Sequence, residues 1–96
     1  MARRRFLVTY DVAEDRRRDQ IFRILGDNGE HLQFSVFLCE LNDRELISMK
    51  AALGEVLHQA QDQVLVIDLG LAEHEASTRI ETLGRAFAVE ERVVVV

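Results

Sequence analysis

The chain has 96 residues, of which 48% are hydrophobic and 30% charged, and this composition predicts one folded domain covering residues 1–96. Its net charge of −5 argues against tight nonspecific binding of nucleic acid, and its single cysteine, Cys39, excludes an internal disulfide or a cysteine-based zinc site within one chain. No apolar stretch approaches the roughly 18 residues of a membrane helix, and the apolar run after the basic start is too short for a signal peptide. We therefore expect a cytoplasmic protein with no membrane partner.

The charge is distributed unevenly along the chain. Residues 1–25 carry seven arginines against four acids, a net +3, so the remaining residues carry −8. One face should therefore have a local positive field that reaches about 8–10 Å at ordinary salt. On an acidic chain, this pattern predicts that a partner protein, a metal, or both assist the binding of an anion.

The first predicted unit is a strand followed by a helix. Residues 6–11 form a short apolar run that ends on Asp11, which is typical of a buried strand whose last residue reaches the rim of a sheet. A helix is expected after a short turn, with Asp15 as its N-cap and apolar side chains at helical spacing. Residues 26–29, Gly-Asp-Asn-Gly, are expected to stop this helix in a left-handed cap.

The next segments predict one or two strands, a helix and a strand. Residues 31–41 are extended, with Phe34 among the residues on one side and Phe37 among those on the other, and periodicity does not decide between one bent strand and two short ones. Asn42 and Glu45 have the spacing of a capping box, which predicts a helix that continues to about residue 60. Residues 63–69 then predict another buried strand.

The end of the chain predicts two more strands. Residues 78–83 alternate polar and apolar side chains, as a half-exposed strand does. The four valines at 93–96 would need to pair with a sheet, either the chain's own or that of a second subunit. The element order predicts an α+β fold, a ferredoxin-like βαββαβ sandwich with an antiparallel sheet and helices on one face. The sheet face without helices needs a partner, which points to a homodimer.

Asp11 is the candidate metal ligand. Mg²⁺ and Mn²⁺ prefer oxygen ligands and often take only one or two carboxylates plus waters. One aspartate per chain is too few, but a twofold dimer would bring a second Asp11 to the same ion. Such an ion would lower the pKa of a bound water and stabilise charge on a phosphodiester. The alternative interpretation is that Asp11 caps the turn into the following helix.

Arg16, Arg17 and Arg18 are candidate nucleic-acid-binding residues. The guanidinium group presents a fork of donors that suits phosphate, and at a helix start it sits at the unfavourable end of the helix dipole. The alternative is an exposed face on which these arginines pair with Asp15 and Asp19.

Three further side chains are candidates for the same site. Tyr10 and Phe37 could stack on a base or line the site, and Ser35 could bind phosphate. The alternatives are packing against the sheet for the two aromatics and a hydrogen bond to backbone for the serine. The three histidines have no metal-ligand spacing among themselves.

Several of these segments, in this order, resemble the CRISPR-associated protein two family. They are V-T-Y-D-V at residues 8–12, D-R-R-R at 15–18 and Q-F-S-V-F at 33–37. Residues 80–85, I-E-T-L-G-R, and the valine-rich end are also similar to the family, so the resemblance covers nearly the whole chain.

The resemblance implies a function in CRISPR adaptation, the acquisition of spacers for antiviral defence. It implies a ferredoxin-like homodimer whose C-terminal strand is added at the partner's edge, with a divalent metal, Mg²⁺ or Mn²⁺, shared by Asp11 of both subunits. Tyr10 and Asp11 match the strand-end pair of a metal-dependent endoribonuclease or DNase that cleaves phosphodiester bonds. Arg18 matches the basic helix position, and Phe37 matches the aromatic of the S-V-F segment.

Two other functions stay open from the sequence. Some family members are non-catalytic scaffolds that bind duplex DNA and bridge dimers of the CRISPR integrase, the first CRISPR-associated protein. Gln20 and His31 stand where arginine occurs in the family, so this chain has fewer cationic groups near its site. Outside the family, a ferredoxin-like dimer that binds a small regulatory ligand and no nucleic acid is the second alternative. The sequence decides neither whether the chain is an enzyme nor whether its substrate is DNA or RNA.

Overall fold

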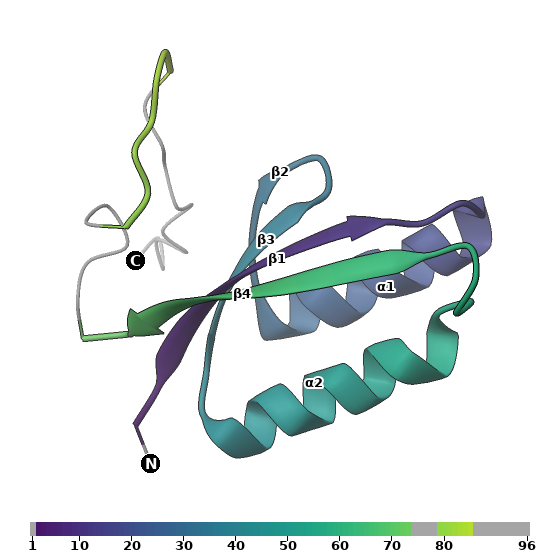
Figure 1. Cartoon of the computed structure of the whole chain (residues 1–96), viewed down its shortest axis with the longest axis horizontal. Coiled ribbons are helices and arrows are strands. Elements are labelled where there is room, and N and C mark those ends of the chain that lie inside the picture. Colours follow the sequence, from purple (N-terminus) through teal and green to yellow (C-terminus); the bar gives the residue numbers. More distant parts are fainter. Residues whose placement is uncertain (1, 74–78, 86–96) are drawn as a thin grey trace, which may run out of the picture.

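The chain alternates strands and helices in a βαββαβ order (Figure 1). We describe a computed structural model over residues 2–73 and 79–85. Its elements are β1 (Arg4–Asp11), α1 (Asp15–Asn28), β2 (Gly29–Gln33), β3 (Val36–Leu41), α2 (Asp43–Val56) and β4 (Gln63–Leu71).

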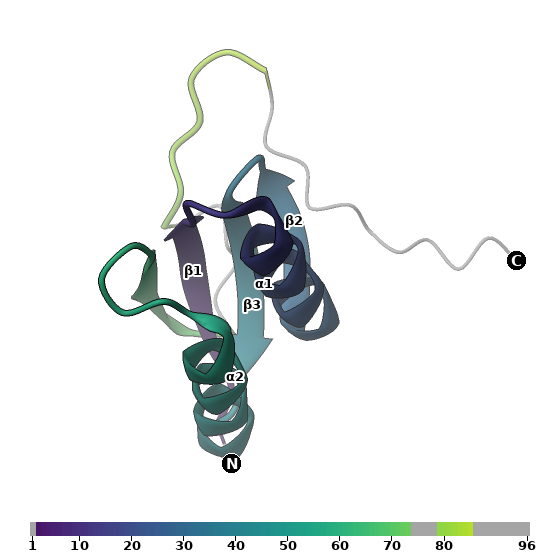
Figure 2. The same cartoon turned by 90° about the vertical axis from the view of Figure 1, so that its right-hand side faces the viewer.

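The four strands form one antiparallel sheet in the order β2-β3-β1-β4. β1 is therefore central, and its residue Leu7 is paired with Leu38 of β3 and with Ile67 of β4. Both helices lie on the same face of the sheet (Figure 2). This arrangement confirms the predicted ferredoxin-like sandwich. Within the described ranges, neither helix has the length and apolar character needed to cross a membrane.

The hydrophobic core fills the layer between the sheet and the two helices. Successive strand residues point to opposite faces, and helix residues four apart share a face, so every second strand residue meets an apolar helix stripe. The buried core residues are Phe6, Val8, Tyr10 and Val12 around β1, Ile21 and Leu25 of α1, Phe37, Cys39 and Leu41 of β3, and Met49 and Leu53 of α2.

The opposite sheet face, here called the open face, is covered by neither helix (Figure 2). By strand alternation and register, its members are Leu7, Thr9 and Asp11 of β1, Val36 and Leu38 of β3, and Leu65 and Ile67 of β4. Leu65 and Ile67 are 48% and 43% exposed. The open face is thus an apolar surface with a carboxylate at its end.

Both ends of α1 differ from the prediction. The N-cap is Glu14, which makes no side-chain capping bond, and Asp15 is already inside the helix. At the other end the helix passes through Gly26 and continues to Asn28. Gly29 follows with a φ of −169°, so the backbone is extended and the predicted left-handed cap is wrong. The helix runs straight into β2. Its junction residue, Gly29, lies so close to the backbone of β3 that a side chain would not fit there.

The segment 31–41 forms two strands rather than one. A turn at Phe34 and Ser35 separates β2 from β3. The predicted capping box of α2 is confirmed: Asn42 Oδ1 accepts from the Glu45 N–H at 2.9 Å, and Glu45 Oε1 accepts from the Asn42 N–H at 3.0 Å. The helix ends at Val56, before residue 60, because the following segment forms its own turn.

The predicted strand at residues 78–83 is wrong where the structure describes it. Residues 79–83 form no strand, and Gly84 has a φ of 87°. Alternating polar and apolar residues give a strand only where a sheet edge accepts their hydrogen bonds, and this segment pairs with no strand of the described sheet. The valines at 93–96, and with them the strand added at the dimer edge, lie outside the described residues.

Candidate functional site

Asp11 ends the central strand with a free carboxylate. It is paired with Gln63 of β4 through the backbone, and its side chain is exposed at the end of the open face. Its carboxylate makes no hydrogen bond or ion pair with any other described residue, and the cap of α1 is Glu14 instead. The alternative interpretation of Asp11 as a capping residue is therefore wrong, and its oxygens are available for a ligand.

The donor set of one chain does not make a metal site by itself. No group of three or more His, Cys, Asp or Glu side chains with metal-binding geometry occurs within residues 2–73 and 79–85. Two copies of Asp11 about a twofold axis would supply the one or two carboxylates that Mg²⁺ takes together with waters. The residues therefore fit a hard cation only in a dimer.

Arg17 is bound within the chain and is not directed at a ligand. Its Nε lies 2.7 Å from Asp62 Oδ2, and its Nη1 lies 3.3 Å from Glu14 Oε2. The hydrogen bond from Arg17, together with those from the N–H groups of His58 and Ala13, lowers the pKa of Asp62 below its ordinary range. The same hydrogen bond raises the pKa of Arg17. This cluster joins the β1–α1 loop, α1 and the turn after α2.

Arg18 is also bound within the chain, whereas Arg16 has no ion pair to a described residue. Arg18 forms an ion pair with Asp15 at 2.6 Å and donates to the Val12 carbonyl at 2.9 Å. For Arg18 the predicted pairing with Asp15 is confirmed. Arg16 is exposed and has no ion pair within the described chain. Of the three arginines, it is the one whose donors face solvent.

Tyr10 and Asp11 are adjacent in sequence but point to opposite faces of the sheet. Tyr10 lies in the core, 8% exposed, where burial raises the pKa of its phenol. Its hydroxyl donates to the Phe34 carbonyl at 3.3 Å, and its ring centroid is 6.4 Å from that of Phe37. The structure therefore gives Tyr10 a packing position and does not bring the two candidate catalytic residues together.

Phe37 and Ser35 are also held by the fold. Phe37 is 1% exposed, with its ring centroid 4.8 Å from that of His31 and 5.4 Å from that of Phe22. Its ring faces are covered, so the packing alternative describes it. Ser35 is half-buried in the β2–β3 turn, and its carbonyl accepts from the Tyr10 N–H at 3.1 Å.

Cys39 is a buried strand cysteine. Desolvation raises the pKa of its thiol to about 11, so the thiolate that a nucleophile or metal ligand needs is not formed near neutral pH.

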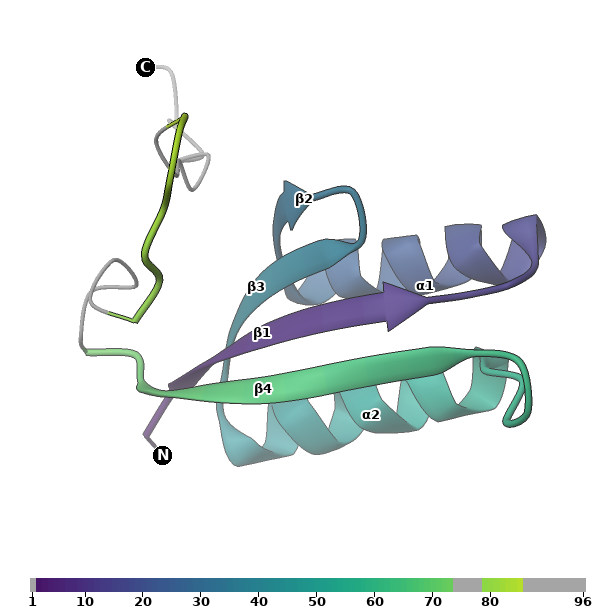
Figure 3. The ribbon, with the colours of Figure 1, turned by 45° about the horizontal axis from the view of Figure 1, so that its top comes forward.

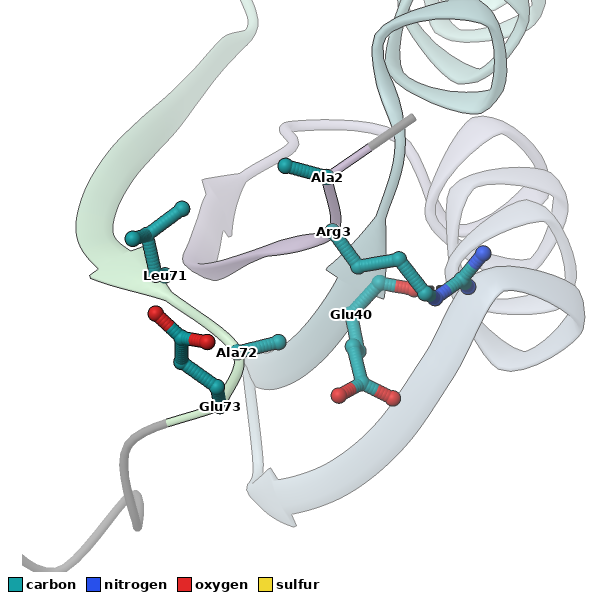
Figure 4. A pocket seen from close by; sticks show the side chains of 6 residues that line it. All are labelled: Ala2, Arg3, Glu40, Leu71, Ala72 and Glu73. Carbon is teal, nitrogen blue, oxygen red and sulfur yellow. Dashed lines mark hydrogen bonds between the residues drawn. The ribbon is translucent and has the colours of Figure 1, made fainter.

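Figure 4 shows a surface pocket of about 360 Å³ at the start of β1, the opposite end of that strand from Asp11. It is lined by Ala2, Arg3, Glu40, Leu71, Ala72 and Glu73, where β1 begins and β4 ends. The Arg3 guanidinium is already bound to Glu45 at 2.7 Å and to the Glu40 carbonyl at 2.7 Å. None of the predicted site residues lines this pocket.

One known family matches most of this chain, and its solved structures share the sandwich fold. A family model described as CRISPR associated protein Cas2 matches residues 4–76. The chain belongs to the Cas2 family. This confirms the resemblance seen in the sequence motifs.

Curated relatives and solved structures of the Cas2 family are similar to this chain over most of its length. It is 37% identical over 82 residues to the CRISPR-associated endoribonuclease Cas2 of Geobacter sulfurreducens, covering 85% of each chain. It is 37% identical over 87 residues to the CRISPR-associated endoribonuclease Cas2 1 of Rhodospirillum rubrum, covering 91% of this chain and 84% of that one. The crystal structure of Streptococcus pyogenes Cas2 matches with a TM-score of 0.70 at 28% identity, over 83% of this chain and 99% of that one. A hypothetical protein from Thermus thermophilus, TT1823, matches with a TM-score of 0.74 at 29% identity, over 86% and 93% of the two chains.

Sequence reasoning missed two residues of this Cas2-family chain. Asp62 organises the loops beside the site, but its partner Arg17 is 45 residues away and no local motif marks the pair. The sequence predicts an extended backbone at Phe34, whereas this residue lies in a turn and is 83% exposed. The signal that could have found Phe34 is the polar pair Gln33 and Ser35 around it, which favours a break between two strands.

Proposed function

We propose that this chain acts in CRISPR adaptation as a homodimeric, metal-dependent endonuclease in which the two Asp11 carboxylates bind one Mg²⁺ or Mn²⁺ ion. The observation that carries the proposal is the state of Asp11. It is the exposed last residue of the central strand, and its carboxylate makes no hydrogen bond or ion pair within the described chain, whereas nearby Asp15 and Asp62 are both paired with arginines. A carboxylate left free at the end of an apolar face suits a ligand that arrives with a second subunit.

The open face supports the dimer on which this proposal depends. Leu65 and Ile67 expose apolar surface beside the central strand, and Asp11 lies at the end of the same face. A twofold contact uses the same patch on both subunits, so packing two open faces about an axis that passes beside the end of β1 would bring the two Asp11 residues together. Burial of the apolar side chains supplies the driving force.

The chemistry divides between the ion and the protein. When bound, the metal would lower the pKa of a water and neutralise charge that develops on the phosphodiester. The Asp11 pair supplies the anionic oxygens that hold it at the twofold axis. Arg16, on the first turn of α1, presents its guanidinium to a phosphate of the substrate.

A second candidate function is a non-catalytic bridge between dimers of the CRISPR integrase, bound to duplex DNA. The observation in its favour is the small number of free cationic groups at the site. Arg17 and Arg18 are held in ion pairs, which leaves Arg16 as the arginine of the D-R-R-R segment without an ion pair to residues 2–73 or 79–85. Strong transition-state stabilisation of a phosphodiester would use more positive charge than this.

The Asp11→Asn variant tests the catalytic proposal. Cleavage of RNA and DNA substrates by the purified protein in Mg²⁺ or Mn²⁺ should fall about 100-fold or more, because a metal ion supplies several kcal/mol of barrier lowering. The matched control is Asp27→Asn, which makes the same chemical change at an exposed residue of α1 and should keep full activity.

The alternatives give different results in the same assay. Equal cleavage by wild type and Asp11→Asn would contradict a catalytic Asp11. A wild-type protein that cleaves neither substrate, yet binds duplex DNA and the integrase, would favour the bridging function.

A further inference from the structure

The turn between β2 and β3 presents an aromatic ring to solvent. This turn consists of Phe34 and Ser35, and the Phe34 side chain is 83% exposed, against 43% for Phe22 and burial for Phe37. A phenylalanine in this position gains nothing from the core. It is therefore available for a contact outside the chain.

The register of the sheet places the backbone of this turn next to the end of β1 that carries Asp11. The last pair of the β1–β3 ladder joins Thr9 to Val36, and beyond it the Tyr10 N–H donates to the Ser35 carbonyl at 3.1 Å. Extended one step into the turn, the same antiparallel register aligns the backbone of Phe34 with that of Asp11. Figure 3 shows the β2–β3 turn and the C-terminal end of β1 at the same end of the sheet.

The backbone under the ring is held from two sides. The Phe34 carbonyl oxygen accepts from the Tyr10 hydroxyl at 3.3 Å. His31 Nε2 lies 3.3 Å from the same oxygen. Because a carbonyl oxygen only accepts, Nε2 must carry the hydrogen. His31 is itself packed against the rings of Phe37 and Phe22, at 4.8 Å and 5.1 Å. The main chain of the turn is thus fixed while the Phe34 ring stays free, which lowers the entropy cost of a contact there.

We propose that Phe34 stacks on an unpaired base of a single-stranded nucleic acid whose phosphodiester lies at Asp11. This inference rests on the proposed function and assigns one more side chain, Phe34, to the contact with its substrate. An exposed ring offers a planar face that any base can cover, and such stacking is how proteins hold single strands with little sequence preference. Bases inside a duplex have both faces covered by their neighbours, so the contact selects single strands, ends and loops. Arg16 supplies the cationic contact to the backbone at the same end of the sheet.

A tryptophan in place of Phe34 gives a direct readout, because the chain has no tryptophan of its own. The Phe34→Trp variant is titrated in EDTA with single-stranded oligoadenylate RNA of about 12 nucleotides, a length within the usual site size, and with the matching DNA. We expect either strand to quench the tryptophan fluorescence, and a blunt-ended duplex of the same length to leave it unchanged. The control is Ile47→Trp, which places the probe at a 67% exposed position of α2 and should not be quenched.

Affinity gives the second readout. Phe34→Ala should weaken binding of the single strand about fivefold or more, as expected for the loss of one stacked base, whereas Phe34→Tyr should retain it. The dependence of affinity on salt should be the same in Phe34→Ala as in wild type, because no phosphate contact is removed. A purely structural role for Phe34 would not separate alanine from tyrosine in this way.

Three results would overturn the inference. The first is a single strand that binds the Phe34→Trp variant without quenching, and the second is failure of the single strand to bind at all. The third is a blue shift of the emission with protein concentration alone, which would place the ring in the subunit interface. Quenching that persists in a protein without nuclease activity would support the stacking contact and contradict the metal-dependent cleavage, so the two proposals fail separately.

Discussion

Gly29 joins α1 to β2 at a point where the backbone of β3 passes very close. A Cβ added there would overlap the Leu38 carbonyl oxygen and lie 2.6 Å from the Sγ atom of Cys39. Both atoms belong to the packed interior of the sheet, where the backbone cannot move aside. Glycine is therefore required at this position by space, not by its dihedral angles.

The Gly29→Ala variant should lower the free energy of unfolding by about 1–3 kcal/mol, the usual cost of overpacking. The matched control is Gly26→Ala in α1, where an added Cβ meets nothing within 4 Å. It should raise the free energy of unfolding by about 0.5–1 kcal/mol, because alanine favours the helix over glycine. Urea denaturation measures both, and equal effects of the two variants would show that the predicted overlap is relieved at no cost.

At this scale the sequence predicts some side chains of the site and misplaces others. The position of Asp11 could be predicted because a carboxylate at the end of an apolar strand is placed at the solvent-exposed rim of the sheet. The sequence does not show whether the rings of Phe37 and Tyr10 are buried or exposed. The packing of α1 on the sheet decides this, and it buries both rings. Arg17 could not be separated from Arg16, since its partner Asp62 is distant in the chain.

At the scale of elements, Asp62 connects three segments that would otherwise be separate. Its carboxylate accepts from the Arg17 guanidinium of α1, from the Ala13 N–H before α1, and from the His58 N–H after α2. These donors favour the ionised form, so the pKa of Asp62 in the folded protein lies below its ordinary value of 3.8. Asp62 thus holds the loop that precedes α1 through Ala13, and Arg18 holds the same loop through the Val12 carbonyl.

The Asp62→Asn variant should be less stable than wild type at neutral pH, and the difference should depend on pH. A carboxyl whose pKa is depressed on folding stabilises the protein above its unfolded pKa, and that contribution is lost as pH falls toward the folded pKa. The gap between wild type and variant should therefore be constant from about pH 5 to 7 and shrink below about pH 4. Thermal unfolding across this range measures it, with Asp27→Asn as the control. A gap that is unchanged down to pH 2 would mean that the ionised form is not what stabilises the fold.

The element order could be predicted because each element has its own local signal. Short apolar runs mark β1 and β4, helical spacing marks α1 and α2, and the Asn42–Glu45 capping box marks where α2 begins. The ends of helices depend on tertiary contacts, which is why α1 passes through Gly26 and α2 stops at Val56. The segment 78–83 has a strand pattern without a strand partner in the described sheet, so its pattern alone was not enough.

At the scale of the molecule, the fold is one-sided. Both helices cover one face of the sheet, and the open face keeps Leu65 and Ile67 partly exposed next to the central strand (Figure 2). Alternation along β1 sends Asp11 to this same face. A contact that covers the open face therefore also decides what surrounds the carboxylate, and the proposed metal site depends on it.

The Ile67→Glu variant tests whether a second copy of the chain covers the open face. In a dimer packed through this face, the new carboxylate would be buried without a partner, at a cost of the order of several kcal/mol per ion, so we expect monomers at concentrations where wild type is dimeric. The fold itself should stay intact, because Ile67 is 43% exposed within the chain. Ile47→Glu, on the solvent side of α2, makes the same change away from the open face and should remain dimeric. Sedimentation velocity measures the assembly and circular dichroism the fold. An Ile67→Glu variant that remains dimeric would place the subunit interface elsewhere, and the two Asp11 carboxylates would then lose the geometric basis for sharing an ion.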